Sequence, residues 1–125
     1  MINNPNYKYT SRRSVTLGLN GTVVTSNPLA ANAGLDMLKK GGNAVDAAVC
    51  AASVLNVVEP MSTGVGGDVF ALVYESKTKK IEALNGSGRS SMRTNVDDLR
   101  KEGMDSIPLE GPYSGMAVSV PGCVD

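Results

Sequence analysis

The 125-residue sequence contains no histidine and no tryptophan, and only two cysteines. The lack of histidine removes the side chain that most often serves as a general base or a metal ligand near neutral pH. No Ser/His/Asp triad can form within this stretch, and no side chains have the spacing of a metal site, so we expect neither metal nor cofactor. Cys50 and Cys123 form no CxxC motif, and a disulfide between them is the less favoured alternative.

Neither sign of charge dominates, because 12 lysines and arginines balance 12 aspartates and glutamates. No basic block is present, which argues against nucleic acid and anionic membranes as partners. The longest apolar run, residues 44–58, is too short to cross a bilayer and contains Asp46. The first residues lack the apolar core of a signal peptide. From these features we expect a cytoplasmic protein that contacts no membrane.

The stretch 41–67 is the one around which the rest of the chain is organised. Asn43 and Asp46 have the spacing of a helix capping box, which explains Asp46 more economically than a role as a buried acid. Residues 44–58 are apolar on almost every side, which is typical of a helix buried on almost every side. The many alanines allow neighbouring elements to approach closely. We therefore predict a buried central helix over 44–58, packed against a sheet.

Further elements are predicted on both sides of this helix. Ser26-Asn27-Pro28 is a helix-start signal, and the helix that follows is predicted to end near Lys40, with Gly41 as its left-handed cap. Before it, residues 15–19 and 21–25 are predicted as strands joined by a tight turn at Asn20 and Gly21.

The second half of the sequence predicts an antiparallel hairpin, a short helix and a last strand. Residues 68–74 and 80–84 are the hairpin strands, with a polar turn between them. Thr94 and Asp97 form a capping-box pattern for a helix that Gly103 ends. Residues 116–120 are the last strand. The mixture predicts an α+β fold, divided into a polar arm (1–14) and one domain (15–125) that we expect to be part of a longer chain.

Two glycine-rich loops are candidate binding sites. Residues 64–67 could cradle an anion with backbone amides, but they follow a helix and precede a strand, so a tight connection with positive φ is favoured. In the second loop, Arg89 follows Ser87 and Gly88 at the end of a predicted strand. A guanidinium there can bind a carboxylate with two hydrogen bonds, or can tie backbone carbonyls together; the residues alone favour neither. For Glu59, which precedes Pro60, satisfaction of backbone donors is favoured over catalysis.

Five motifs now occur together in a recognisable order: TSNPLA (25–30), GGNAVDAA (41–48), VEP (58–60), GVGG (64–67) and NGSGR (85–89). In this order and spacing the chain resembles the N-terminal part of the large subunit of the γ-glutamyltranspeptidase family. The NGSGR loop is more similar to the acylase-like branch of that family than to the transpeptidases themselves. The resemblance covers roughly residues 15–122.

The resemblance implies an N-terminal nucleophile hydrolase with a four-layer αββα sandwich. Such precursors cleave themselves and expose a threonine, which attacks the substrate while its own amine acts as base, so histidine is not required. That threonine lies far downstream, so this chain would hold no catalytic residue and would be inactive alone. Its partners would be the rest of its precursor and a γ-glutamyl or related acyl substrate, as in glutathione metabolism.

The resemblance also implies a substrate-binding role for the second glycine loop. In the transpeptidases an arginine in this loop binds the substrate carboxylate, and alignment places Ser87 nearest to that position. Either Arg89 replaces it from two residues further on, with Ser87 and Gly88 beside it, or the branch accepts a different acyl group, which argues against glutathione as the substrate. A non-catalytic relative and a small anion-binding domain are the alternatives.

Overall fold

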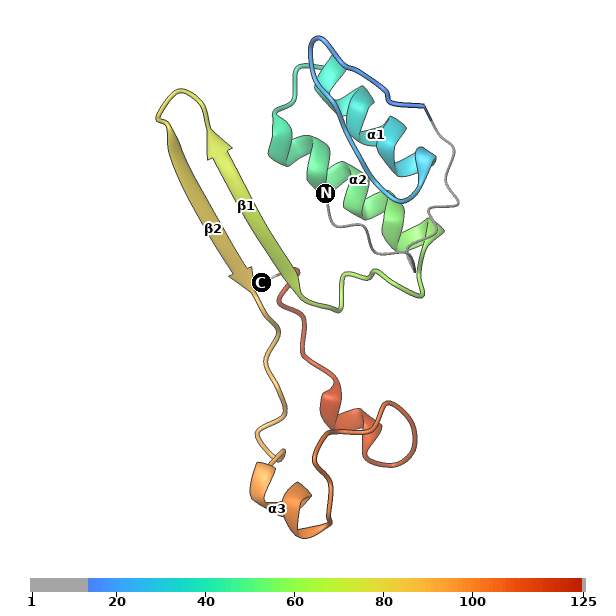
Figure 1. Cartoon of the computed structure of the whole chain (residues 1–125), viewed down its shortest axis with the longest axis vertical. Coiled ribbons are helices and arrows are strands. Elements are labelled where there is room, and N and C mark those ends of the chain that lie inside the picture. Colours follow the sequence, from blue (N-terminus) through green and yellow to red (C-terminus); the bar gives the residue numbers. More distant parts are fainter. Residues whose placement is uncertain (1–13, 125) are drawn as a thin grey trace, which may run out of the picture.

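The computed structural model describes residues 14–124 and contains helices and strands in mixed order, as predicted (Figure 1). The elements are α1 (Pro28–Lys39), α2 (Ala44–Val58), β1 (Val69–Glu75), β2 (Lys80–Gly86), α3 (Val96–Lys101) and a 3₁₀-helix (Ser114–Ala117). Except for Ser14, the predicted polar arm lies outside the described residues.

Helix α1 begins and ends at the residues that its signals predict. The side chain of Asn27 accepts a hydrogen bond from the Leu29 amide at 2.9 Å, and proline occupies the first helical turn. At the other end Gly41 has a φ of 93°, and the Gly42 amide donates to the Met37 carbonyl at 3.0 Å. This left-handed glycine cap turns the chain directly into α2.

Helix α2 opens with the predicted capping box. The Asn43 side chain accepts from the amides of Val45 and Asp46 at 2.8 and 3.0 Å, while the Asp46 carboxylate accepts from the Asn43 amide at 2.8 Å. Asp46 is exposed, so its role here is capping and not that of a buried acid.

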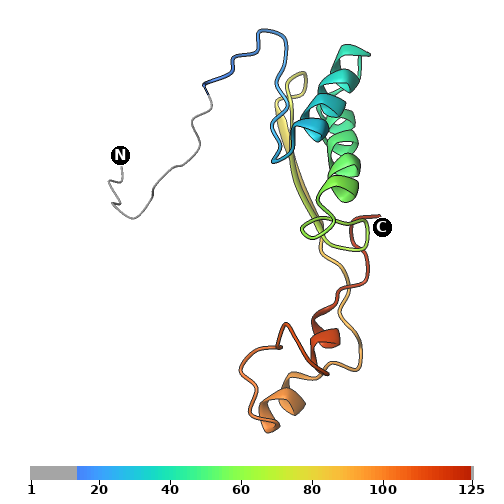
Figure 2. The same cartoon turned by 90° about the vertical axis from the view of Figure 1, so that its right-hand side faces the viewer.

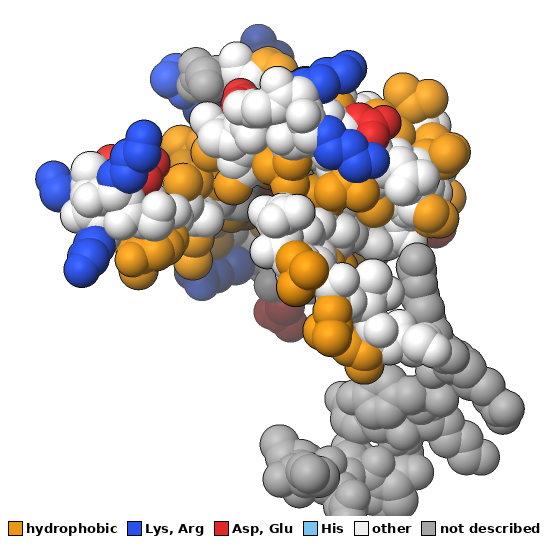
Figure 3. All heavy atoms as spheres, turned by 90° about the horizontal axis from the view of Figure 1, so that it is seen from above, with side chains coloured by type: hydrophobic (Ala, Val, Ile, Leu, Met, Phe, Trp, Pro, Cys, Tyr) orange, Lys and Arg blue, Asp and Glu red, His pale blue; other side chains and the backbone are white. Residues whose placement is uncertain are grey.

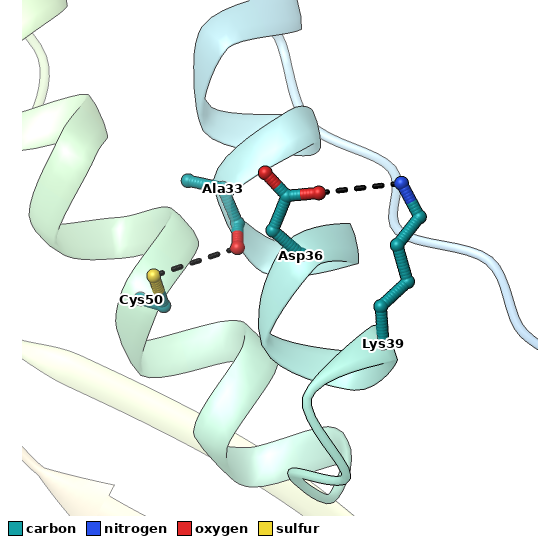
Figure 4. A network of polar contacts seen from close by, with 4 residues as sticks. All are labelled: Ala33, Asp36, Lys39 and Cys50. Carbon is teal, nitrogen blue, oxygen red and sulfur yellow. Dashed lines mark hydrogen bonds and ion pairs between the residues drawn. The ribbon is translucent and has the colours of Figure 1, made fainter.

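Small residues bring α1 and α2 into close contact. Ala30, Ala47 and Ala51 are the buried hydrophobic residues of residues 14–124. A Cβ placed on Gly34 of α1 would lie 2.9 Å from the Ala47 carbonyl oxygen of α2, so only glycine allows this approach. Beside it, the Cys50 thiol donates to the Ala33 carbonyl at 3.6 Å (Figure 4). The prediction that alanines permit close packing is confirmed.

The prediction that α2 is buried on almost every side is wrong for this chain. Val45, Val49 and Val57 are 44%, 60% and 78% exposed. The reason is geometric: α2 is apolar around most of its circumference, whereas α1 covers only one side of it. Seen from above, hydrophobic side chains lie at the surface of both the hairpin, at the left, and the helix pair, at the right (Figure 3).

Strands β1 and β2 form the predicted antiparallel hairpin, with a register that runs from Val69 opposite Gly86 to Glu75 opposite Lys80. Side chains alternate between the two faces of the pair. One face carries Phe70, Leu72 and Tyr74, which are 67%, 78% and 62% exposed. The hairpin therefore presents an apolar face that no part of residues 14–124 covers.

Three predicted strands are absent from the described residues. Residues 15–19 and 21–25 belong to no helix or strand and form no ladder, because no strand lies beside them for pairing. Instead residues 21–25 cross the helix pair and bound an open cavity of about 520 Å³ against the alanines of α2. Where residues 116–120 were predicted as a strand, the 3₁₀-helix is followed by a single bridge at Val120.

The short helix α3 is correctly predicted, but its cap lies one residue later than expected. The Asn95 side chain accepts from the Asp97 amide at 2.9 Å, whereas the buried Thr94 hydroxyl has no hydrogen-bond partner among the residues that the structure describes. Gly103, with a φ of 75°, follows the helix as predicted. Residues 90–117, in orange to red, extend away from the helix pair and the hairpin (Figure 2).

Candidate functional site

The second glycine loop lies against the last segment of the described chain, at the base of the hairpin (Figure 1). The Arg89 amide donates to the Val120 carbonyl at 3.1 Å, and the Val120 amide donates to the Arg89 carbonyl at 2.8 Å. This isolated antiparallel bridge fixes the backbone of Arg89 on both sides.

Asp68, directly before β1, joins the two segments through its side chain. Its Oδ1 atom accepts a hydrogen bond from the Gly88 amide at 2.7 Å and another from the Ser119 hydroxyl at 2.8 Å. The Gly88 amide, followed by the Ser119 hydroxyl, lowers the pKa of Asp68 below its ordinary value of 3.8, because both donors favour the charged form. Asp68 is therefore a carboxylate at neutral pH.

Two glycines allow the segments to come this close. A Cβ on Gly88 would overlap the Val120 carbonyl oxygen and lie 2.8 Å from the Ser119 Cβ. A Cβ on Gly122 would overlap the Gly86 carbonyl. Any larger residue at either position would push the loop away from the C-terminal segment. The glycine-rich composition of this loop thus serves close approach of two backbones.

The joined segments enclose an open groove of about 410 Å³. Its lining residues are Ser87, Gly88, Arg89, Val120, Pro121, Gly122 and Val124. The three predicted substrate-binding residues, which are consecutive in the chain, all line this groove. The Ser87 and Arg89 side chains are exposed, and within residues 14–124 the Arg89 guanidinium forms no ion pair. The guanidinium also donates no hydrogen bond to a carbonyl of that range. The alternative that Arg89 holds backbone carbonyls together is therefore not seen in the described residues.

The first glycine loop differs from its prediction. None of the three glycines in residues 64–67 has a left-handed φ, so the expectation that this connection requires positive φ is wrong. The Gly67 amide donates to the Gly64 carbonyl at 3.2 Å, and the Gly67 carbonyl accepts from the Cys123 amide at 3.0 Å. This loop therefore supports the same C-terminal segment that Asp68 and Arg89 hold.

Glu59 lies away from this groove and links the ends of the helix pair. Its Oε2 atom accepts from the Ser26 hydroxyl at 2.8 Å, 33 residues earlier in the chain. Its backbone carbonyl accepts from the amides of Ser62 and Thr63. The carboxylate thus satisfies a side-chain hydroxyl, whereas backbone donors were the expected partners.

Sequence reasoning missed three residues of the candidate site: Asp68, Ser119 and Gly122. The local sequence predicts Asp68 as the first residue of a strand, and nothing in it indicates a partner 51 residues away.

Among residues 14–124 no cluster of three or more acidic or cysteine side chains could hold a metal ion. No helix in the same range has the length and apolar character needed to traverse a membrane.

Comparison with known proteins identifies the family of the chain. The sequence model of the family described as Gamma-glutamyltranspeptidase matches residues 30–125. The chain is 42% identical to the glutathione hydrolase proenzyme of Bacillus subtilis over 119 residues, which is 94% of this chain and 20% of that protein. It is 33% identical to an acylase proenzyme of Pseudomonas sp., covering 93% of this chain and 22% of that protein.

Solved structures give the same result. The chain superposes on the crystal structure of Helicobacter pylori γ-glutamyltranspeptidase with a TM-score of 0.73 and 30% sequence identity, over 89% of this chain and 32% of that one. It spans about a fifth of the length of the curated relatives that it matches. With a family model over residues 30–125 and relatives of both the hydrolase and acylase kinds, the resemblance inferred from the sequence is confirmed, and the chain belongs to the γ-glutamyltranspeptidase family.

Proposed function

We propose that this chain is the N-terminal part of the large subunit of an enzyme that transfers or hydrolyses a γ-glutamyl or related acyl group. Its support is the family membership and the name proenzyme that its relatives carry. The proposed nucleophile is a threonine, freed by self-cleavage elsewhere in the precursor, with its own amine as base. On this proposal the present chain is inactive alone, and its contribution is to bind substrate. A cytoplasmic location stays a prediction.

The single observation that carries the binding role is the exposed Arg89 guanidinium, which forms no ion pair within residues 14–124 and lies at a groove of about 410 Å³. A guanidinium presents a planar fork of donors that matches a carboxylate. The bridge to Val120 holds its backbone still, which reduces the ordering needed when substrate binds. The exposed Ser87 hydroxyl and the Gly88 backbone flank the same groove. We assign all three residues to recognition of an acyl donor that carries a free carboxylate.

The remainder of the precursor is the proposed partner of the apolar surfaces. The hairpin face with Phe70, Leu72 and Tyr74 is exposed here, as are three of the five valines of α2. Burial of such side chains is worth about 1.5–3 kcal/mol each, so a precursor several times longer than this chain gains stability by covering them. In the proposed four-layer αββα arrangement, a second sheet would pack on the hairpin and further layers would cover α2.

The experiment is kinetic and uses the full-length protein. Replacing Arg89 by alanine should raise KM for γ-glutamyl p-nitroanilide roughly tenfold or more, since a charge-assisted pair is lost. Self-cleavage should be unaffected, because the role proposed for Arg89 is to bind substrate. Arg100→Ala on α3 is the matched control, since it removes the same charge at an exposed site away from the groove. Unchanged kinetics in the Arg89 variant would exclude it from substrate binding.

The two alternatives make different predictions for the same material. A non-catalytic relative would show no self-cleavage and no turnover, while retaining its fold. A small anion-binding domain that uses the glycine loops would bind phosphate but not glutamate in isothermal titration. Binding of glutamate that Arg89→Ala abolishes, together with a threonine exposed by cleavage, supports the acyl-transfer proposal.

A further inference from the structure

Asp68 forms hydrogen bonds to two distant segments, and the proposed binding role of Ser87, Gly88 and Arg89 does not account for them. It lies at the start of β1, yet one of its oxygens accepts from Gly88 and from Ser119, 20 and 51 residues further along the chain. It is the side chain at which three separate segments meet. The residue that follows Gly88 is Arg89.

The contacts around Asp68 act on one stretch of backbone. The hydrogen bond from the Gly88 amide to Asp68, at 2.7 Å, fixes the Ser87–Gly88 peptide, one residue before Arg89. Ser119, the second donor, directly precedes Val120, whose backbone forms both hydrogen bonds of the Arg89 bridge. A single carboxylate therefore holds both strands of the bridge from which the Arg89 side chain projects.

The space around Gly88 is too small for any other residue in this arrangement. An added Cβ on Gly88 would lie 2.9 Å from the Asp68 Oδ1 atom and would overlap the Val120 carbonyl oxygen. The loop is thus pressed between the carboxylate and the C-terminal segment. Without the acceptor at position 68, the Gly88 amide loses its partner, and the loop gains freedom to move away from Val120.

We propose that Asp68 is a positioning residue, which sets the direction of the Arg89 guanidinium through the Gly88 amide and the Ser119 hydroxyl. This inference rests on the proposed substrate-binding role of Arg89 and extends it. Asp68 itself does not touch the substrate. Its charge is maintained by the two donors, and its function is to keep the glycine loop docked so that Arg89 is presented in one orientation. Misplacing a binding group by about 1 Å is enough to cost a large factor in rate.

The test is a double-mutant cycle in the full-length enzyme, with γ-glutamyl p-nitroanilide and the carboxylate-free butyryl p-nitroanilide as acyl donors. Asp68→Ala should raise KM for the γ-glutamyl donor on the order of tenfold, and should leave kinetics with the butyryl donor unchanged. In an Arg89→Ala background the same change should have a much smaller effect, because the main group being positioned is gone. A purely structural role would instead affect both donors and both backgrounds.

Two further variants keep the result interpretable if Asp68→Ala impairs self-cleavage. Asp68→Asn retains an oxygen acceptor of the same shape and should rescue most of the affinity. Ser119→Ala removes only one of the two hydrogen bonds and should give a smaller rise in KM with the same dependence on Arg89. Asp105→Ala, an exposed aspartate outside the groove, is the control for charge and should behave as wild type.

The outcomes separate this inference from the proposed function. A rise in KM for Arg89→Ala, with wild-type kinetics for Asp68→Ala and Ser119→Ala, overturns the positioning role and leaves the binding proposal intact. Equal effects of Asp68→Ala in the presence and absence of Arg89 also overturn it. Unchanged KM in Arg89→Ala refutes the binding proposal, and the positioning role with it.

Discussion

Gly34→Ala is the most informative change in the helix pair, because helix propensity and packing predict opposite signs. Gly34 lies in the interior of α1, where replacing glycine by alanine normally stabilises a helix by about 1 kcal/mol. Here the new Cβ would lie 2.9 Å from the Ala47 carbonyl oxygen and 2.9 Å from the Val23 Cγ1 atom. The valine side chain can rotate away, but the carbonyl moves only if α2 moves with it.

The magnitudes decide the sign. Forcing a methyl group into a packed contact costs roughly 1–3 kcal/mol, which exceeds the propensity gain, so a net loss of about 1 kcal/mol is expected. Opening of the helix pair should then become about fivefold more frequent. Hydrogen exchange followed by mass spectrometry on peptides spanning residues 28–58 of the full-length protein measures this directly.

Gly64→Ala is the matched control for this experiment. A Cβ on Gly64 would meet no atom of residues 14–124 within 4 Å, and the φ of Gly64 is not left-handed. Exchange in the helix pair should therefore match that of the wild type. Slower exchange of α1 in Gly34→Ala would mean that propensity dominates, and would refute the close approach of the two helices.

Two further predictions concern single polar contacts. Asn43→Ala removes the acceptor for the Val45 and Asp46 amides and should destabilise α2 by about 1 kcal/mol; exchange in its first turn should accelerate, and unchanged exchange would contradict the capping box. For Asp68, a folded-state pKa below 3.8 means that the carboxylate's stabilisation is complete above pH 3.8 and is lost as the pH falls through the folded-state value. The amide shift of Gly88 in glycine-labelled protein should titrate below pH 3.8 and should lose this dependence in Asp68→Asn; titration at or above that value would contradict the contact.

The features that the sequence predicted correctly depend on residues close together in the chain. The Asn43 and Asp46 box, the Pro28 start of α1 and the Gly41 cap each involve groups within a few residues. The hairpin is also local, with one short turn between its strands. Thr94 shows the limit of such patterns, since its neighbour Asn95 has the same capping ability and takes the position.

The features that were missed depend on segments far apart in the chain. Nothing near Asp68 indicates that its partners are Gly88 and Ser119, since that contact follows from how three segments meet. Residues 21–25 have strand-like composition, but a strand also requires a neighbour, and none lies beside them among the described residues. Likewise the apolar circumference of α2 predicts burial without saying which segment covers it. Arg89 was singled out from its chemistry and from the family resemblance and stays a prediction as a binding residue, whereas the contacts of Asp68 that hold its loop were not predicted.

The bridge between Arg89 and Val120 has a consequence for how this family can vary in length. The bridge pairs the residues on either side of segment 90–119, so the two ends of this segment stay together regardless of its length (Figure 2). Closing a longer loop adds only about 0.6 kcal/mol for each doubling of its length. Residues can therefore be inserted or deleted around α3 without displacing the Arg89 guanidinium. We expect the chain lengths of relatives to differ most within the segment that corresponds to residues 90–119.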